Sequence, residues 1–309
     1  MNKKLKRDVR AFQKRVLMGK ATNWVIVEGR IHDRAFYSRL LESISPNGYA
    51  RSVVMLAETL TVEGQCAGGK PHMLKLYDSF KTSDTLLQEN VAGQSAVIFF
   101  LDRDLDDYLT PLVPREHLIF TQNMDVESEI FAHAKLDRAL CATHGLDQVE
   151  VSDFFASIPQ PTSNLFKIWR MWIKLRLISL HCEIPNGRRF SQPSKINSNT
   201  YGEVCNERYQ AIHDELQKCA QSTEFEDVKS RVESDLENII ALQREYTLVP
   251  GKWIPGYLRH LIEERFRSDI VRKNVSDLEI TTACLQSIEF SDSWTSYYET
   301  QLQSILVRS

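Results

Sequence analysis

Acidic side chains follow directly on three short apolar runs of this sequence. Glu28 follows one run, Asp102 and Asp104 follow another, and Glu127 lies just past a third. Carboxylates that gather in one place repel one another and need a positive charge among them. Oxygen ligands select a hard cation such as Mg²⁺ or Mn²⁺, and such an ion polarises a phosphodiester and activates water. The pattern therefore predicts metal-assisted phosphoryl transfer.

The apolar runs that precede these acids, together with one more, are predicted to be strands. Their β-branched composition and the turn residues around them indicate strands at 23–27, 52–56, 96–101 and 118–120. Helical spacing fills the segments between them, including a helix from about Pro71 to Gln88. Alternation of strands and helices over about residues 20–140 predicts an α/β domain with a mainly parallel sheet between helices.

The carboxyl ends of parallel strands share one edge of a sheet, and sites form there. Alternate residues of an extended segment also point the same way, so we expect Asp102 and Asp104 to converge on one cation. Solvated turn acids are the alternative interpretation. Spacing argues against two other motifs. A calcium loop needs Gly and Glu where Asp107 and Val113 stand, and a haloacid-dehalogenase-like phosphatase needs Thr or Val at Asp106.

The character of the sequence changes after about residue 145. The segment 165–180 is strongly helical, and 203–245 carries many acids in a long helical pattern. The first 20 residues are basic, with apolar residues at helical spacing, and predict an amphipathic helix packed on the body. We expect a basic helix at 1–20, the α/β domain at 21–145, and a mostly α-helical domain at 146–309 for partner or substrate binding and dimerisation.

The bulk composition favours a cytoplasmic protein. The formal net charge of the 309 residues is -3, so contact with nucleic acid must rely on local patches. The six cysteines lie too far apart for a zinc finger and suggest reduced thiols. No apolar run is long enough to span a membrane, and the N-terminus lacks the pattern of a signal peptide.

Two basic segments are candidates for phosphate binding. Lys167, Arg170 and Lys174 share one helical face within an aromatic-rich segment, so they could follow a phosphate backbone. A core helix whose cations reach solvent is the favoured alternative. Lys70 follows Gly68-Gly69, a loop that could present backbone amides to a phosphate, although a plain loop is the simpler interpretation.

The two acidic motifs together resemble the Toprim fold, which topoisomerases, primases and overcoming-lysogenization-defect (OLD) nucleases share. Its signature is an apolar strand ending in Glu-Gly and a later strand ending in Asp-x-Asp, here Glu28-Gly29 and Asp102-Arg103-Asp104. The fuller pattern is similar to stand-alone Toprim nucleases of bacterial defence, especially the effector subunit of PARIS anti-phage systems. Supporting features are Phe36-Tyr37, Gly68-Gly69-Lys70, Thr121 with Asp125 and Glu127, and Gly251-Lys252.

The resemblance implies a role for each matching acid. Glu28 would be a metal-linked general acid/base, and Asp102 and Asp104 would hold Mg²⁺, with Mn²⁺ as a substitute. Glu127 would add a metal ligand or orient one.

One position departs from the family pattern. Relatives usually place an acid four residues after the Glu, but His32 stands there, with Asp33 next. Either Asp33 takes this catalytic place through a small shift, or this corner of the site is weakened. N-capping of the following helix is the alternative role for Asp33.

The resemblance also implies a biological setting. The chain would be a Mg²⁺-dependent endonuclease toxin of an abortive-infection system, held inactive by an ABC-type ATPase partner. Once released it would form a homodimer and cut host nucleic acid, with tRNA favoured over DNA. Two alternatives stay open: a non-catalytic Toprim sensor or binding subunit of an ATPase complex, and a DNA-nicking Toprim nuclease.

Overall fold

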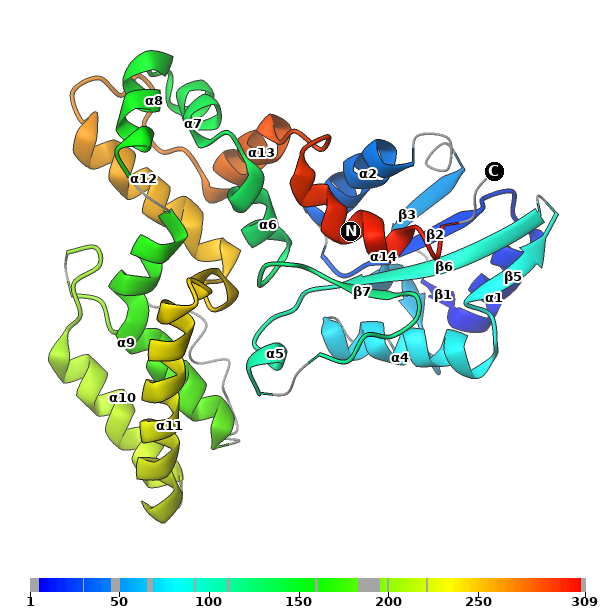
Figure 1. Ribbon diagram of the computed structural model, residues 1–309, viewed down its shortest axis with the longest axis horizontal. Helices are drawn as coiled ribbons and strands as arrows, with labels where there is room; N and C mark the ends of the chain where they lie inside the picture. The colour runs from blue at the N-terminus through cyan, green and yellow to red at the C-terminus, as the bar shows by residue number, and fades with distance from the viewer. Residues whose placement is uncertain are drawn as a thin grey trace.

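The computed structural model describes most of the chain. The described residues are 6–29, 31–45, 51–65, 69–91, 93–109, 112–158, 161–182, 195–198, 200–220 and 222–306. Within them the protein is a mixed α/β structure, with a small, mainly parallel sheet flanked by helices and a helical C-terminal region (Figure 1).

The sheet is centred on its longest strand, β6. Its strands are β2 (Asn23–Val27), β3 (Ser52–Leu56), β5 (Leu87–Asn90), β6 (Gly93–Leu101) and β7 (Leu118–Phe120). β3, β2, β6 and β7 are parallel neighbours in that order, whereas β5 runs antiparallel beside the first half of β6. The predicted strands 23–27, 52–56 and 118–120 are confirmed, and the predicted strand 96–101 begins three residues earlier.

The helix predicted to continue to Gln88 is wrong at its C-terminal end. α4 (Lys70–Thr82) ends before Asp84, which has a φ of 55° in the left-handed region. The N–H of Thr85 then donates to the carbonyl oxygen of Phe80, which closes the helix and turns the chain into β5. Leu86 and Leu87 fit a helical period and a strand equally well, so the apolar pattern alone did not separate them.

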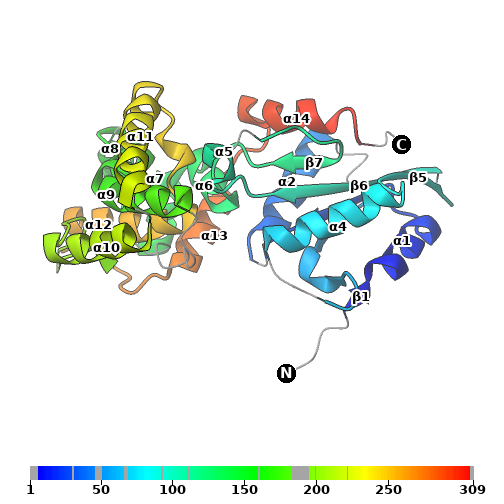
Figure 2. The ribbon, with the colours of Figure 1, turned by 90° about the horizontal axis from the view of Figure 1, so that it is seen from below.

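Helices cover both faces of the sheet (Figure 2). On one face, α4 and α1 (Val9–Met18) bury side chains that include Phe12, Val16 and Phe80 against β2 and β6. This confirms the N-terminal helix packed on the body, for the residues of 1–20 that the structure describes. The other face carries α2 (Asp33–Ile44) and α14 (Ser296–Leu302), with Tyr298 of α14 lying near Phe100 of β6.

The second half of the chain is helical, as predicted. Its longer helices are α6 (Val126–His133), α7 (Leu136–His144), α8 (Gln148–Ala156), α9 (Pro161–His181), α10 (Asn206–Cys219), α11 (Ser222–Ala241), α12 (Ile254–Arg265) and α13 (Asp277–Ser287). The acidic 203–245 segment forms two of them, because the chain becomes extended at Ala220. No helix among the described residues is long and apolar enough to cross a membrane.

Short elements complete the fold. They are β1 (Arg7–Asp8), β4 (Leu60–Thr61), α5 (Asp106–Leu109) and the 3-10 turns η1 (Ala57–Thr59), η4 (Glu245–Thr247), η5 (Gly251–Trp253) and η6 (Ser293–Thr295). One continuous apolar core runs from the α2 face of the sheet into the helical half. α14, late in the chain, packs back on the sheet, while the boundary at residue 145 stays a prediction.

Candidate active site: an acidic cluster at the carboxyl edge of the sheet

The parallel register brings the predicted acids to one edge of the sheet. Val27 of β2 pairs with Phe100 of β6, so Glu28 and Asp102 both follow neighbouring strand ends. The negative charges of Asp33, Glu28 and Asp104 act on Asp102. So does that of a further acid, Asp125. The acids expected to meet therefore lie close enough to repel one another.

Glu28 lies at the centre of this cluster. Burial, followed by the charges of Asp104 and Asp33, raises the pKa of Glu28 to about 7, although the nearby Lys70 opposes the shift. Its Oε2 is buried and has no hydrogen-bond partner. One oxygen of this buried carboxyl group therefore has no partner in spite of the nearby Lys70, and a bound cation would supply one.

Asp102 and Asp104 come from a turn instead of the extended segment we expected. β6 ends at Leu101, and Asp104 has a φ of 53°, in the left-handed region. The N–H of Asp104 donates to the carbonyl oxygen of Met124 at 2.8 Å, which fixes the turn. Asp102 accepts from the N–H of Val126 at 3.2 Å, and burial, then repulsion from its acidic neighbours, raises the pKa of Asp102 well above its ordinary value.

Asp33 closes the turn after Glu28. Its Oδ2 accepts from the N–H of Gly29 at 2.7 Å, and a Cβ at Gly29 would lie 2.1 Å from Oδ1, so no larger residue fits without movement. Burial raises the pKa of Asp33 to about 6. The N-cap of α2 is His32, not Asp33, so the N-capping alternative is wrong: Asp33 is the first helical residue and joins the acidic cluster.

The start of α6 contributes two acids with different environments. Asp125 caps the helix by accepting from the N–H of Ser128 at 2.7 Å, and also accepts from the N–H of Gly251 at 3.0 Å; burial, then the charge of Glu127, raises its pKa to about 7. Glu127 Oε1 lies 3.7 Å from His32 Nδ1. Burial alone would raise the pKa of Glu127, but His32 and Lys252 hold it below the ordinary value.

Gly251 joins the helical half to this edge of the sheet. A Cβ there would lie 2.2 Å from the backbone nitrogen of Ser128, so glycine alone permits this approach of η5 to α6. The approach also brings Lys252 near Glu127. The Gly251-Lys252 pair thus contacts the site through backbone proximity and charge.

The cations that the sequence suggested for phosphate binding lie in different parts of the structure. Lys70 lies inside the cluster: its Nζ donates to the carbonyl oxygens of Asp102 at 2.6 Å and Arg103 at 3.0 Å, and is 3.7 Å from Asp104 Oδ2. Arg170 and Lys174 form ion pairs with acids of α11, which are Glu233 and Glu237. Arg170 and Lys174 thus already have acidic partners within the chain. Lys167 is exposed to solvent.

Arg176 on α9 is a site residue that the sequence did not reveal. It is largely buried, and its charge interacts with Asp104 and Asp125. Its Nη1 is buried and makes no hydrogen bond. Burial lowers the pKa of Arg176, against the pull of these two acids. Helical spacing puts Arg176 off the face of Lys167, Arg170 and Lys174, but only the packing of α9 shows which face meets the sheet half.

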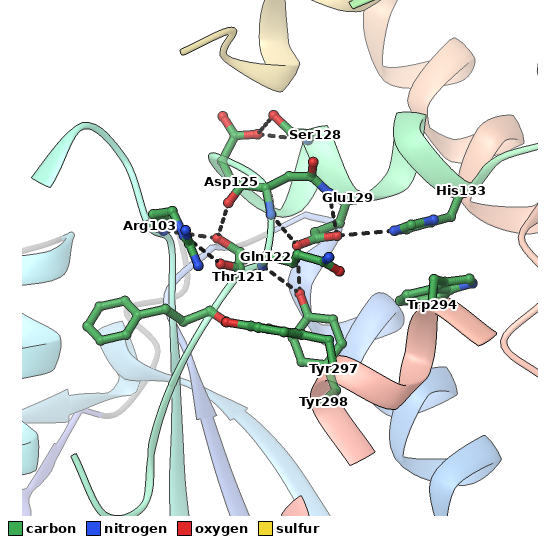
Figure 3. A network of polar contacts seen from close by, with 12 residues as sticks. Arg103, Thr121, Gln122, Asp125, Ser128, Glu129, His133, Trp294, Tyr297 and Tyr298 are labelled. Carbon is green, nitrogen blue, oxygen red and sulfur yellow. Dashed lines mark hydrogen bonds and ion pairs between the residues drawn. The ribbon is translucent and has the colours of Figure 1, made fainter. Parts of the chain in front are cut away.

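A polar network holds the loop between β7 and α6 (Figure 3). The hydroxyl of Thr121 accepts from the N–H of Arg103 and donates to the carbonyl oxygen of Asn123. The buried Glu129 accepts from the N–H and side-chain amide of Asn123, each at 2.7 Å, and from the hydroxyl of Tyr298 at 2.7 Å. This network fixes the loop that supplies Asp125.

The carboxylate oxygens of the cluster suit a hard cation, but the side chains are not yet arranged to coordinate one. Glu28, Asp102 and Asp104 offer carboxylate oxygens, and Oε2 of Glu28 is free to bind. In the part of the chain that the structure describes, no three His, Cys, Asp or Glu side chains already stand as ligands around one point. The side chains would therefore have to turn toward an ion. Neither a protein-family model nor a curated protein matches this chain, so its function must be inferred from this geometry.

Proposed function

We propose that this chain is a Mg²⁺-dependent endonuclease of the Toprim type. The observation that carries the proposal is the convergence of Glu28, Asp33, Asp102 and Asp104 at the carboxyl edge of a parallel sheet, with raised pKa values for Glu28, Asp33 and Asp102. Such a group of buried acids is tolerable when a cation joins it. The Glu-Gly and Asp-x-Asp sequence motifs support the same conclusion.

Each residue then has a chemical part. Glu28, Asp102 and Asp104 would hold Mg²⁺, with Mn²⁺ as a substitute, and Glu127 would orient a ligand. When bound, the ion supplies Lewis-acid stabilisation of a phosphodiester and a more acidic water. Glu28, with a pKa of about 7, can hold or release a proton near neutral pH, as a general acid/base requires. Lys70 fixes the Asp102–Asp104 turn through its two carbonyl contacts.

The substrate and setting follow from the resemblance to PARIS effectors. The chain would be released from an ABC-type ATPase during phage infection, form a homodimer and cut host tRNA. Its own net charge of -3 does not favour nucleic acid in general, so recognition would depend on surfaces near the site or on the partner.

A cleavage assay tests the activity. Purified wild-type chain is incubated with total tRNA and, separately, with supercoiled DNA, in Mg²⁺, Mn²⁺ or EDTA. Glu28→Gln keeps the size and shape of the side chain, and Glu116→Gln, an 81% exposed acid, is the matched control. We expect metal-dependent cleavage of tRNA by the wild type and Glu116→Gln only. Cleavage that survives Glu28→Gln or EDTA contradicts the assignment, and cutting of DNA alone identifies the DNA-nicking alternative.

The same comparison can be made in cells. Sequencing of RNA ends after expression of the wild type and of Glu28→Gln should show new 5′ or 3′ ends at defined tRNA positions in the wild type alone. Identical RNA ends in the two cultures would argue against a host RNA target.

A non-catalytic Toprim subunit is the second candidate. Two observations favour it: His32 stands at the usual acidic position and faces Glu127, and no ligand cage is preformed among the described residues. This candidate predicts no binding of Mn²⁺ by calorimetry and an effect of Glu28→Gln on ATPase assembly alone. Mn²⁺ binding that Glu28→Gln removes would exclude it.

A further inference from the structure

Arg176 differs from the other cations of its helix. Arg170 and Lys174 point to α11 and pair with its acids, whereas Arg176 is directed to the sheet half and interacts with Asp104 and Asp125. It is largely buried, yet Nη1 has no acceptor. A buried guanidinium N–H without an acceptor is costly. Such a group is therefore suited to an acceptor that arrives with a ligand.

The surroundings of Asp104 give a ligand a way in. Figure 1 shows α5 on the side of the sheet half that faces α9 and α11. The Tyr108 hydroxyl of α5 donates to Asp235 of α11 at 2.9 Å, and its ring packs on His181 of α9. A cavity of about 240 Å³ lies at this junction, between Arg103 and Asp104 on one side and residues of α11 and η4 on the other.

The helical half also contributes a cation to the lining of this cavity. Arg244, next to η4, lines it from the helical half and is exposed. A phosphate group that enters beside Asp104 would therefore meet arginines from both halves, Arg103 and Arg244. Arg176 interacts with the same Asp104. The planar guanidinium donors match the oxygens of a phosphodiester better than an ammonium does.

We propose that Arg176 is a catalytic residue that binds a non-bridging oxygen of the scissile phosphate, which enters through the cavity beside Asp104. The inference rests on the proposed nuclease function and names a residue for it. In hydrolysis the water oxygen forms a bond to phosphorus, the bond from phosphorus to one ester oxygen breaks, and a water proton ends on that leaving oxygen. A guanidinium on the non-bridging oxygens stabilises the charge of this transition state.

Two substitutions separate charge from shape. Arg176→Met keeps the length of the stem and removes the donors, whereas Arg176→Lys keeps the charge without the fork. Arg259→Met is the matched control, since Arg259 is a partly buried arginine of the helical half whose partner is Asp277. We expect Arg176→Met to lower kcat for tRNA cleavage by about 100- to 1000-fold with a much smaller change in KM. Arg176→Lys should recover part of that loss, and Arg259→Met should not change kcat.

Two further measurements exclude a merely structural role. In Arg176→Met the melting temperature should not fall, and the Mn²⁺ affinity should stay the same or rise, because a charge that competes for Asp104 is removed. If either falls in step with activity, or if kcat is unchanged, the inference is overturned. Anisotropy of a labelled oligoribonucleotide in Ca²⁺ should show binding about threefold weaker, or more, for Arg176→Met than for Arg259→Met.

The binding measurement also separates the two proposals. If the wild type fails to cleave any substrate, the nuclease function fails, but oligonucleotide binding still decides whether Arg176 contacts phosphate. Equal binding by wild type and Arg176→Met overturns the contact. Cleavage by wild type that Arg176→Met leaves intact overturns the residue assignment and leaves the nuclease function standing.

Discussion

Two buried carboxylates, Asp102 and Glu129, have opposite electrostatic environments. Glu129 accepts hydrogen bonds from Asn123 and Tyr298, and His133 lies 3.4 Å away. Burial alone would raise the pKa of Glu129, but these partners hold it below the ordinary value. Asp102 has one backbone donor and several acidic neighbours, and burial raises its pKa well above the ordinary value.

The comparison separates a structural acid from a functional candidate. Both carboxyl groups are buried, so burial cannot explain why the pKa of one is raised and that of the other is lowered. The neighbouring donors and charges explain it. The donors around Glu129 come from the loop between β7 and α6 and from α14. They stabilise its negative charge without any ion from outside the chain. The charge of Asp102 is opposed by its neighbours, and a cation from outside would relieve the repulsion. Perturbed acids of this kind concentrate at functional sites.

The largest expected effect is on catalysis. Asp102→Asn keeps the acceptor for the Val126 N–H and removes one metal-binding charge, so tRNA cleavage should fall by about 1000-fold or more. Glu129→Gln should retain much more activity per folded molecule. Rates are measured on the folded fraction at saturating Mg²⁺. Similar losses in both variants would end the distinction between the two acids.

The next effect is on stability and has the opposite ranking. Glu129→Gln introduces an amide donor where three donors already point, and should lower the free energy of unfolding by about 2–4 kcal/mol. Urea denaturation checks this value. Asp102→Asn in metal-free buffer at pH 8 should leave the stability unchanged or raise it by about 1 kcal/mol, because it removes a repulsive charge. A loss of stability in Asp102→Asn comparable to that in Glu129→Gln would show that Asp102 is also structural.

Divalent cations should sharpen the contrast further. Mg²⁺ or Mn²⁺ at about 100 times its dissociation constant should stabilise the wild type by about 2.7 kcal/mol. Glu129→Gln should show the same increment from its lower starting value, while Asp102→Asn should show little of it. Thermal unfolding with and without EDTA gives the increments. An increment that persists in Asp102→Asn would place the cation elsewhere.

The smallest effect is a dependence of metal-free stability on pH. The pKa of Glu28 is raised from 4.5 to about 7 and that of Asp33 from 3.8 to about 6. Between these limits the folded state holds protons that the unfolded state has released, so the free energy of unfolding falls as pH rises from about 4 to 7. Each of these two groups should contribute a fall of up to about 1.4 kcal/mol per pH unit within its own range, and Glu28→Gln should make the slope shallower. A slope that Glu28→Gln leaves unchanged would refute the raised pKa.

Much of the scaffold could be predicted from the sequence because buried strands correspond to continuous runs of apolar residues. The runs at 23–27 and 118–120 gave correct boundaries. Glu28 directly follows the end of β2, beside the end of β6. The edge strand β5 was missed, because its Leu87-Gln88 start resembles the end of a helix. The left-handed turn at Asp104 was missed because nothing in Asp-x-Asp distinguishes a turn from an extended segment.

The parts of the site that the sequence could not supply come from long-range packing. From the sequence, Asp125 is an ordinary N-cap residue. Only the structure shows that Gly251 and Asp102 lie near Asp125, which makes it part of the acidic cluster. Arg176 stands among other bases of α9, and its direction depends on how that helix meets α5. Local patterns encode elements and their ends, whereas the meeting of distant elements is decided by three-dimensional packing.

The return of α14 to the sheet has a consequence for synthesis of the protein. Tyr298 bonds both Glu129 and the N–H of Gln122, so the loop that carries Asp125 lacks two of its anchors until the ribosome has added residue 298. The acidic motifs emerge early in translation, but Tyr298 follows nearly 200 residues after Asp102. A nascent chain would thus lack an ordered acidic cluster for most of its elongation, which would delay the proposed activity until the chain is nearly complete.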